Sequence, residues 1–214
     1  MYRYPYFPRS ACADKWLLPL AEKGKGIEIG GSAHNDFFIP GCLNVDYTDD
    51  MSTIFKQEEV RLCGRAKPVD IVNFADSLSF DDSDVSFIIN SHVFEHQVNP
   101  IKTLLEWHRV IHNEGIIFSI IPKRDALKSD AGLPITSLYH QIFDWYQNQT
   151  YETHVISEGN AKYGHYHIYS VESYIELIDF FNDMNPSDRL EIVEIMETDD
   201  KVGNGSIFVH RVIK

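Results

Sequence analysis

The stretch that decides the fold of this chain is Gly-Ile-Glu-Ile-Gly-Gly-Ser-Ala-His-Asn-Asp at residues 26–36, followed by Leu-Asn-Val-Asp-Tyr at residues 43–47. An apolar run that ends in two glycines, Gly30 and Gly31, is typical of a buried strand entering a turn where a ligand approaches bare backbone. The second run ends in Asp46, at the expected carboxyl end of a neighbouring strand. Ligands of open parallel sheets bind at such ends, where an acid can accept hydrogen bonds from ribose hydroxyls. The two stretches therefore predict a site for a nucleoside-containing cofactor.

This glycine turn differs from two common nucleotide-binding motifs. A dinucleotide fingerprint starting at Gly30 requires glycine where Ser32 and Asn35 stand, and no Gly-Lys-Ser/Thr ending of a phosphate loop follows. The turn has instead an acid, Glu28, two residues before its first glycine. A carboxylate beside exposed backbone amides suits a ligand that carries both an ammonium group and a carboxylate. S-adenosylmethionine is such a ligand.

Strands and helices are expected to alternate along the first part of the chain. Apolar runs bounded by turn residues predict five strands, at residues 27–29, 44–46, 69–74, 85–89 and 116–121. Helices are expected near residues 53–63 and from the Asn99-Pro100 cap to residues 113–115. This alternation predicts an α/β fold with a doubly wound, mostly parallel sheet.

The second part of the chain breaks this alternation. Residues 123–163 are too long for an ordinary connection, and we expect them to form a helical insertion after the fifth strand, with a helix around 136–148. A further helix is expected to start at Ser170, and residues 190–196 and 206–213 predict an antiparallel pair of strands. We expect one domain over residues 1–214.

The composition excludes several classes of partner. The chain has 19 lysines and arginines against 32 aspartates and glutamates, and this charge of −13 disfavours nucleic acid and membrane surfaces. Cys12, Cys42 and Cys63 are far apart, so we expect free thiols, no disulfide and no structural zinc. The start of the chain lacks the apolar core of a signal peptide, and no apolar run could span a bilayer. These features favour a cytoplasmic protein.

Four segments, in this order, resemble motifs of the class I S-adenosylmethionine-dependent methyltransferases, in particular the small bacterial type 11-like branch. Residues 28–31 resemble the first motif, although Ser32 and His34 stand where that motif has glycines. Asp46 stands where the family holds the ribose hydroxyls, and residues 75–78, Ala-Asp-Ser-Leu, look like the segment that contacts adenine. Residues 90–96, Asn-Ser-His-Val-Phe-Glu-His, resemble the segment that lines the methionine side of the cofactor.

The resemblance implies a fold, a cofactor and a binding site. The fold is a Rossmann-like sheet of seven strands with an antiparallel C-terminal strand. The cofactor is S-adenosylmethionine, with S-adenosylhomocysteine as the product. The residues expected to bind it are Glu28, Gly30, Gly31, Ser32, Asp46, Asp76, Ser77, Leu78, Asn90, Ser91 and His92.

Two histidines before the late helix, His165 and His167, resemble a His-x-His feature of the same branch. Alternation in an extended segment points both side chains the same way. A neutral imidazole can take up the proton released when a methyl group is transferred to oxygen or nitrogen. We expect His167 to be the catalytic base, with His165 and then His92 as the next candidates. The structural alternative is that these are buried histidines hydrogen-bonded to backbone.

Metal binding is another alternative for the histidines. His165, His167, His140 or His154 could bind a metal together with Glu95 or Asp144, and His92 and His96 are four residues apart, a spacing that suits a metal. Such histidines are more often satisfied by hydrogen bonds, so we expect no metal.

The sequence thus predicts an enzyme that transfers the methyl group of S-adenosylmethionine to a small-molecule acceptor. By analogy with relatives in polysaccharide pathways, we expect an oxygen of a sugar or phosphorylated cell-surface polysaccharide precursor. Its pocket is expected between residues 123–163 and the face carrying His165 and His167, with His92 opposite. One alternative is a catalytically degenerate fold that acts as a binding module. The other is an NAD-dependent oxidoreductase, against which Ser32 weighs.

Overall fold

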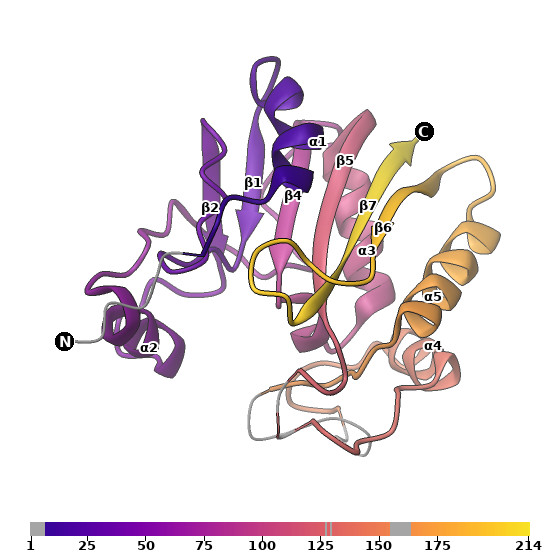
Figure 1. Ribbon diagram of the computed structural model, residues 1–214. Helices are drawn as coiled ribbons and strands as arrows, with labels where there is room; N and C mark the ends of the chain where they lie inside the picture. The colour runs from indigo at the N-terminus through magenta and orange to yellow at the C-terminus, as the bar shows by residue number, and fades with distance from the viewer. Residues whose placement is uncertain (1–6, 127, 129, 155–163) are drawn as a thin grey trace.

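Seven strands form one mixed sheet in the computed structural model, which describes residues 7–126, 128, 130–154 and 164–214 (Figure 1). Their order is β3-β2-β1-β4-β5-β7-β6. Neighbouring strands among β1 to β5 are parallel, whereas β7 is antiparallel to both β5 and β6. The strands are β1 (Gly26–Ile29), β2 (Cys42–Asp46), β3 (Ile71–Val72), β4 (Val85–Ser91), β5 (Ile111–Pro122), β6 (Arg189–Met196) and β7 (Gly205–Ile213). The predicted α/β fold is confirmed.

Helices cover both faces of this sheet. On one face Leu17 of α1 shares a core with Phe87 and Phe118. On the other face Trp107 and Tyr174, from α3 and α5, are fully buried in a second core. Burying a large apolar side chain contributes about 1.5–3 kcal/mol, so these helices fix both faces of the sheet. The helices are α1 (Ala11–Ala21), α2 (Ile54–Cys63), the 3-10 helix η1 (Phe94–His96), α3 (Pro100–Val110), α4 (Leu138–Tyr146) and α5 (Val171–Met184).

Side-chain caps explain where the predicted helices begin. The Asn99 side chain accepts a hydrogen bond from the Lys102 amide, and Pro100 occupies the first turn of α3. Ser170 and Ser173 form a reciprocal capping box at the start of α5. These caps were readable from the sequence, and both helix starts are confirmed.

The boundary between α3 and β5 differs from the prediction. Residues 113–115 were expected to end the helix, but α3 ends at Val110 and these residues lie inside β5. Between the pairs Val85–Ile111 and Phe87–Ile116, β4 advances by two residues while β5 advances by five. Glu114 has a φ of 66°, so the expected turn exists but is accommodated as an irregularity within the strand.

The strand β3 and the insertion also depart from expectation in extent. β3 covers only Ile71–Val72, because Asn73 Oδ1 then accepts hydrogen bonds from the amide and hydroxyl of Ser79, which turns the chain away. Of the predicted insertion at residues 123–163, residues 127, 129 and 155–163 lie outside the described residues, and the described part contains α4. Among all the residues that the structure describes, no helix combines the length and apolarity needed to cross a membrane.

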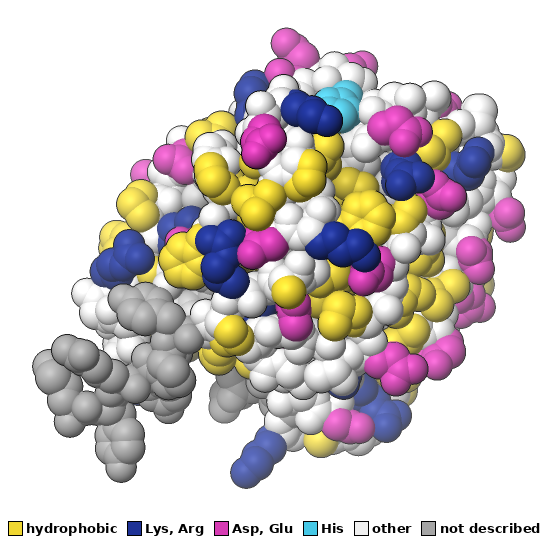
Figure 2. All heavy atoms as spheres, turned by 45° about the horizontal axis from the view of Figure 1, so that its top comes forward, with side chains coloured by type: hydrophobic (Ala, Val, Ile, Leu, Met, Phe, Trp, Pro, Cys, Tyr) yellow, Lys and Arg dark blue, Asp and Glu magenta, His cyan; other side chains and the backbone are white. Residues whose placement is uncertain are grey.

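The carboxyl ends of the parallel strands point toward α2 and α4, which lie beyond them on opposite sides in Figure 1. The opposite end of the molecule comes forward in Figure 2, where lysines and arginines are interspersed with acidic side chains. The predicted site residues therefore lie at the edge bounded by α2 and α4.

Candidate cofactor site and active site

The glycine turn after β1 requires glycine for steric reasons. Gly30 has a φ of 67°, and a Cβ atom there would lie 2.6 Å from Val93 Cγ2. Its amide donates to the Val45 carbonyl oxygen at 2.8 Å, which joins the turn to β2. Residues 30–41 then reach β2 without forming a helix. The turn is thus a narrow, fixed corner at the carboxyl edge.

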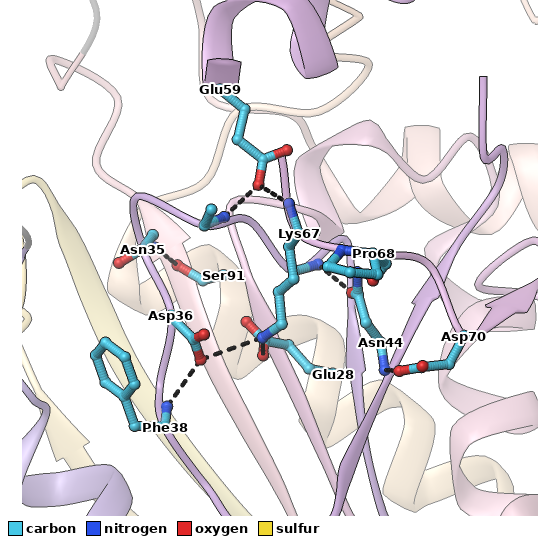
Figure 3. Close-up of polar contacts among 12 residues, drawn as sticks. Glu28, Asn35, Asp36, Phe38, Asn44, Glu59, Lys67, Pro68, Asp70 and Ser91 are labelled. Atoms are coloured by element: carbon cyan, nitrogen blue, oxygen red, sulfur yellow. Dashed lines mark hydrogen bonds and ion pairs between the residues drawn. The ribbon is translucent and has the colours of Figure 1, made fainter. Parts of the chain in front are cut away.

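An ion-pair network of Glu28, Lys67 and Asp36 lies next to the glycine turn (Figure 3). The Glu28 carboxylate lies 2.6 Å from Lys67 Nζ, which also contacts Asp36 at 3.2 Å. The side chains of Glu28 and Lys67 are only 5% and 17% exposed. Burial raises the pKa of Glu28, and the nearby lysine opposes this. Glu28 therefore holds the loop through Lys67, and its carboxylate is already engaged.

Two further side chains fix the backbone of the glycine turn. Asn44 Oδ1 accepts from the Gly31 amide at 3.1 Å. Glu59 of α2 accepts from the amides of Ala33 and Lys67. Glu59 and Lys67 were not predicted from the sequence, because each reaches the turn from a distant segment and no local motif marks them.

Two acids predicted to bind the nucleoside lie at successive strand ends. Asp46 ends β2, where Lys56 of α2 lies 3.2 Å from its carboxylate. Asp76 follows β3 and pairs with Lys102 at 2.8 Å. The aromatic side chains beside them, Tyr47 and Phe74, are each 49% exposed. Carboxylates next to half-exposed aromatic rings suit a nucleoside, whose base can pack on the rings.

The remaining predicted cofactor residues divide into edge and interior positions. Ser91 ends β4 and its hydroxyl accepts from the Asn35 amide group at 3.1 Å. Asn90 is buried and donates to Ser119 Oγ at 2.7 Å. Ser77 forms an isolated bridge with Phe74, and Leu78 is buried. Ser32 is part of the loop between β1 and β2.

Three histidines surround a buried acid beyond β4. Glu95 Oε1 lies 3.8 Å from His92 Nδ1 and 3.9 Å from both His96 Nε2 and His165 Nε2. Neither oxygen of Glu95 has a hydrogen-bond partner among the described residues. Burial raises the pKa of Glu95 to about 8 and lowers that of His96 to about 4. We call Glu95, His92, His96, His165 and Asp130 the open histidine cluster, because His92 and His96 are 27% and 26% exposed.

Two members of the open histidine cluster are positioned by specific contacts. His92 has a φ of 56°, an uncommon backbone conformation, and its Nε2 lies 3.1 Å from Asn204 Oδ1. His165 Nδ1 lies 2.7 Å from Asp130 Oδ2. When Nδ1 donates to Asp130, Nε2 of His165 has no proton and can accept one. Asp130 and Asn204 are functional candidates that the sequence analysis did not identify.

His167 belongs to a different group of side chains. Its Nε2 lies 3.7 Å from Asp144 Oδ2, and His140 and His154 point at the same carboxylate oxygen. The amides of Tyr166 and His167 both donate to the Glu95 carbonyl oxygen, so the segment is turned here and simple alternation does not apply. The expectation that His165 and His167 face the same way is therefore wrong. We call His140, Asp144, His154 and His167 the closed histidine cluster.

A cavity of about 640 Å³ adjoins the open histidine cluster at the end of β5. Asn204, the partner of His92, is one of its lining residues. Polar residues line the cavity from the start of the predicted insertion, the start of α5, and the segment between β6 and β7 with the residues next to it. They are Lys123, Arg124, Asp125, Ser170, Glu172, Glu197, Asn204 and Ser206.

Comparison with known proteins shows a likeness to methyltransferases. Residues 31–119 match the family model of a methyltransferase domain. The fold is shared with a structure from Listeria monocytogenes assigned as an S-adenosylmethionine dependent methyltransferase, with a TM-score of 0.54, 8% identity and coverage of 92% of this chain and 94% of that chain. Residues 31–119 of this chain are therefore similar to a methyltransferase domain, and the chain shares the fold of that S-adenosylmethionine dependent methyltransferase structure.

Other comparisons are weaker. A SAM dependent methyltransferase from Aquifex aeolicus has a TM-score of 0.49 at 15% identity, with coverage of 94% of this chain and 93% of that chain. One from Methanosarcina mazei has a TM-score of 0.49 at 14% identity, with coverage of 88% and 92%. The search of curated proteins gave no match. The residues matched by the family model end at Ser119. They include His92, Glu95 and His96, but not the other members of the two histidine clusters.

The residues of this methyltransferase fit S-adenosylmethionine. Asp46 and Asp76 provide acceptors beside half-exposed aromatic rings at the carboxyl edge. The fit differs from the family pattern at Glu28, whose carboxylate is engaged by Lys67. S-adenosylmethionine is the cofactor and S-adenosylhomocysteine the product.

Proposed function

We propose that this methyltransferase acts on an oxygen of a sugar or a phosphorylated cell-surface polysaccharide precursor bound in the cavity at the end of β5. The observation that supports it is the position of Asn204, which lines the cavity and contacts His92 of the open histidine cluster. An acceptor in the cavity lies next to residues that can take up a proton.

Residues in the two halves of the carboxyl edge of the sheet have different roles in the proposed reaction. Bound S-adenosylmethionine supplies an activated methyl group on a positively charged sulfur. Asp46 and Asp76 would hold its nucleoside, and the turn at Gly30 would fix the approach of its methionine part. His165, oriented by Asp130, would accept the proton of the acceptor hydroxyl at Nε2. His92 and Asn204 would orient that hydroxyl, because alignment of the reacting atoms is the main requirement of the transfer.

Two basic side chains of the cavity, Lys123 and Arg124, could bind the phosphate of an acceptor, although the acids Asp125, Glu172 and Glu197 also line the cavity. Lys123 Nζ contacts the Thr198 hydroxyl at 2.7 Å, and Arg124 is an exposed side chain near Asp125. Arginine and lysine are the side chains that bind phosphate oxygens best.

An acceptor screen with a labelled methyl donor tests this proposal. We expect label to be transferred to phosphorylated or nucleotide-linked sugars and less to the neutral sugars. Arg124→Ala should raise KM for a phosphorylated acceptor, whereas Lys15→Ala on α1 should not, because Lys15 pairs with Glu194 away from the cavity. Label transfer only to non-sugar acceptors would contradict the proposal. Thermal shift with S-adenosylhomocysteine, and with NAD as a control, checks cofactor binding separately.

A further inference from the structure

The closed histidine cluster brings together four side chains from three segments. His140 and Asp144 are one helical turn apart on α4, His154 follows that helix, and His167 precedes α5. The side chains of His154 and His167 are 1% and 0% exposed, and that of Asp144 is 3% exposed. His140, whose side chain is 15% exposed, is the most open member of this mostly buried, polar cluster.

His140, Asp144 and His167 have ligand atoms within 4.8 Å of one another, and His154 lies beside His140 and Asp144. Asp144 Oδ2 lies 3.2 Å from His140 Nε2, 3.3 Å from His154 Nε2 and 3.7 Å from His167 Nε2. The Nε2 atoms of His140 and His154 are 3.1 Å apart. A tetrahedral zinc ion with bonds of about 2.0–2.1 Å keeps its ligand atoms about 3.3 Å apart.

One oxygen of Asp144 is left without a hydrogen bond among the described residues. Asp144 Oδ2 is buried and accepts no well-aligned hydrogen bond from the described residues, although three ring nitrogens lie within 3.7 Å of it. The contact between His140 and His154 can use the Nε2 proton of only one ring. His167 Nε2 is also 3.3 Å from the Val98 carbonyl oxygen, a long contact that it would exchange for the metal.

We propose that the closed histidine cluster binds a zinc ion. Three imidazole nitrogens and one carboxylate oxygen are ligands that zinc prefers, and four protein ligands leave no open coordination position. The ion would therefore be structural. This proposal replaces the expectation from the sequence that the chain holds no metal. That expectation rested on cysteine spacing and on the general rarity of metal sites among histidines.

The zinc ion would stabilise the segments next to the proposed active site. It would tie α4 to the segment before α5, in which His165 lies two residues before His167. Asn99 at the cap of α3 also donates to the Asp144 carbonyl oxygen at 3.3 Å. The metal would thus hold α4, α3 and the segment carrying His165 in one arrangement.

Metal analysis of the purified full chain tests the proposal without an acceptor. We expect about one zinc ion per chain from cells grown with zinc. Removing it with 1,10-phenanthroline should lower Tm, and adding ZnCl₂ should restore it. Replacement by Co²⁺ should give the visible absorption of a tetrahedral site. Zinc well below one ion per chain, with no response of Tm to ZnCl₂, would overturn the proposal.

Variants locate the ion. His140→Gln and Asp144→Asn should lose most of the zinc, whereas His112→Gln on β5 should keep it, because that exposed ring hydrogen-bonds to the Asn113 carbonyl oxygen and lies outside the closed histidine cluster. His96→Gln, in the open histidine cluster, should also keep it. Loss of zinc in His96→Gln but not in His140→Gln would place the ion elsewhere and overturn the assignment. If the ligand variants do not fold, the chelation and Co²⁺ measurements on the unmodified chain still decide.

Discussion

Carboxylates at the carboxyl edge of the sheet have different partners in its two halves. Near β1 and β2 they pair with lysines, as Glu28 does with Lys67 and Asp46 with Lys56. Beyond β4 and β5 the buried acids Glu95, Asp130 and Asp144 face histidines. A lysine stays charged and holds a fixed ion pair, whereas a histidine can exchange a proton or bind a metal near neutral pH. The first half is suited to holding a cofactor and the second to chemistry.

The histidine half itself contains two arrangements. In the open histidine cluster, His92 and His96 retain about a quarter of their exposure, and Asn204 connects the cluster to the cavity. In the closed histidine cluster, Asp144 and His167 are buried. The same residue types can therefore serve proton transfer in one place and a structural metal in the other, because access to substrate differs.

The largest expected effect is on turnover, from His165→Ala. Loss of the proposed base should lower turnover about 10²–10⁴-fold with the acceptor found in the screen. The affinity for S-adenosylhomocysteine, measured by calorimetry, should not change, because His165 lies in the histidine half. Asp130→Asn keeps the ring but removes its anchor, and should lower turnover less.

A control in the closed histidine cluster sharpens this comparison. His167→Ala should lower Tm and zinc content, and reduce turnover only through that loss of structure. If His167→Ala instead lowers turnover as far as His165→Ala while zinc and Tm stay unchanged, His167 is the base, as predicted from the sequence alone.

The lysine half should respond in stability. Lys67→Met leaves Glu28 buried without its partner, and we expect a loss of about 3 kcal/mol in the free energy of unfolding, measured with urea. The matched control is Lys25→Met, which breaks the pair of Lys25 with Asp84, 2.7 Å long and well exposed. That change should cost less than about 1 kcal/mol. Equal losses of stability in the two variants would show that the buried pair contributes no more than the exposed pair.

The same variant has a defined pH dependence. Burial raises the pKa of Glu28, and Lys67→Met removes the charge that opposes this rise. The folded variant then binds more protons than the unfolded chain, so its stability falls as pH rises above the ordinary pKa of a glutamate. The difference in the free energy of unfolding between Lys67→Met and the unmodified chain should therefore become smaller toward acidic pH. A constant difference between pH 4 and 8 would contradict this account.

Features encoded by local spacing were predictable from the sequence. The strand and glycine turn at residues 26–31, the acid at Asp46 and the cap at Ser170 each depend on neighbouring residues. Partners distant in sequence were not predictable. Lys67 is 39 residues from Glu28, and Asp130 is 35 residues from His165. No periodicity links such pairs, because the sheet and the insertion bring them together only after folding.

The assignment of His165 and His167 to different clusters was also not predictable from local spacing. Treating residues 165–167 as an extended segment predicted one face for both histidines. The Glu95 carbonyl oxygen accepts from two successive amides there and turns the segment, so each ring joins a different acid. This contact depends on η1, whose position relative to residues 164–167 is a tertiary feature.

Affinity for the cofactor should show a smaller effect, from Asp46→Ala. Removing the proposed acceptor of the ribose hydroxyls should cost about 1–3 kcal/mol of S-adenosylhomocysteine affinity by calorimetry. Asp50→Ala is a suitable control, because the exposed Asp50 side chain accepts hydrogen bonds from the nearby Ser52. Unchanged affinity in Asp46→Ala would show that Lys56 holds this acid for stability alone.

The smallest effect is expected at Asp76, the most exposed acid of the lysine half. Its side chain is 22% exposed and its partner Lys102 is 47% exposed, so this pair should contribute little to stability. Asp76→Ala should cost at most about 1 kcal/mol of S-adenosylhomocysteine affinity, because water can replace an exposed acceptor.

Selectivity for the base is the sharper measure of Asp76. S-inosylhomocysteine has a carbonyl oxygen where adenine has its exocyclic amine, so an ionised Asp76 should disfavour it through two opposed acceptors. The unmodified chain should therefore bind S-adenosylhomocysteine more tightly, and Asp76→Ala should narrow the difference, while Lys102→Ala should preserve it. If Asp76→Ala keeps the full preference, the adenine amine is recognised by another group and the acid only pairs with Lys102. In that case Asp46 would be the one lysine-paired acid of this half that contacts the nucleoside.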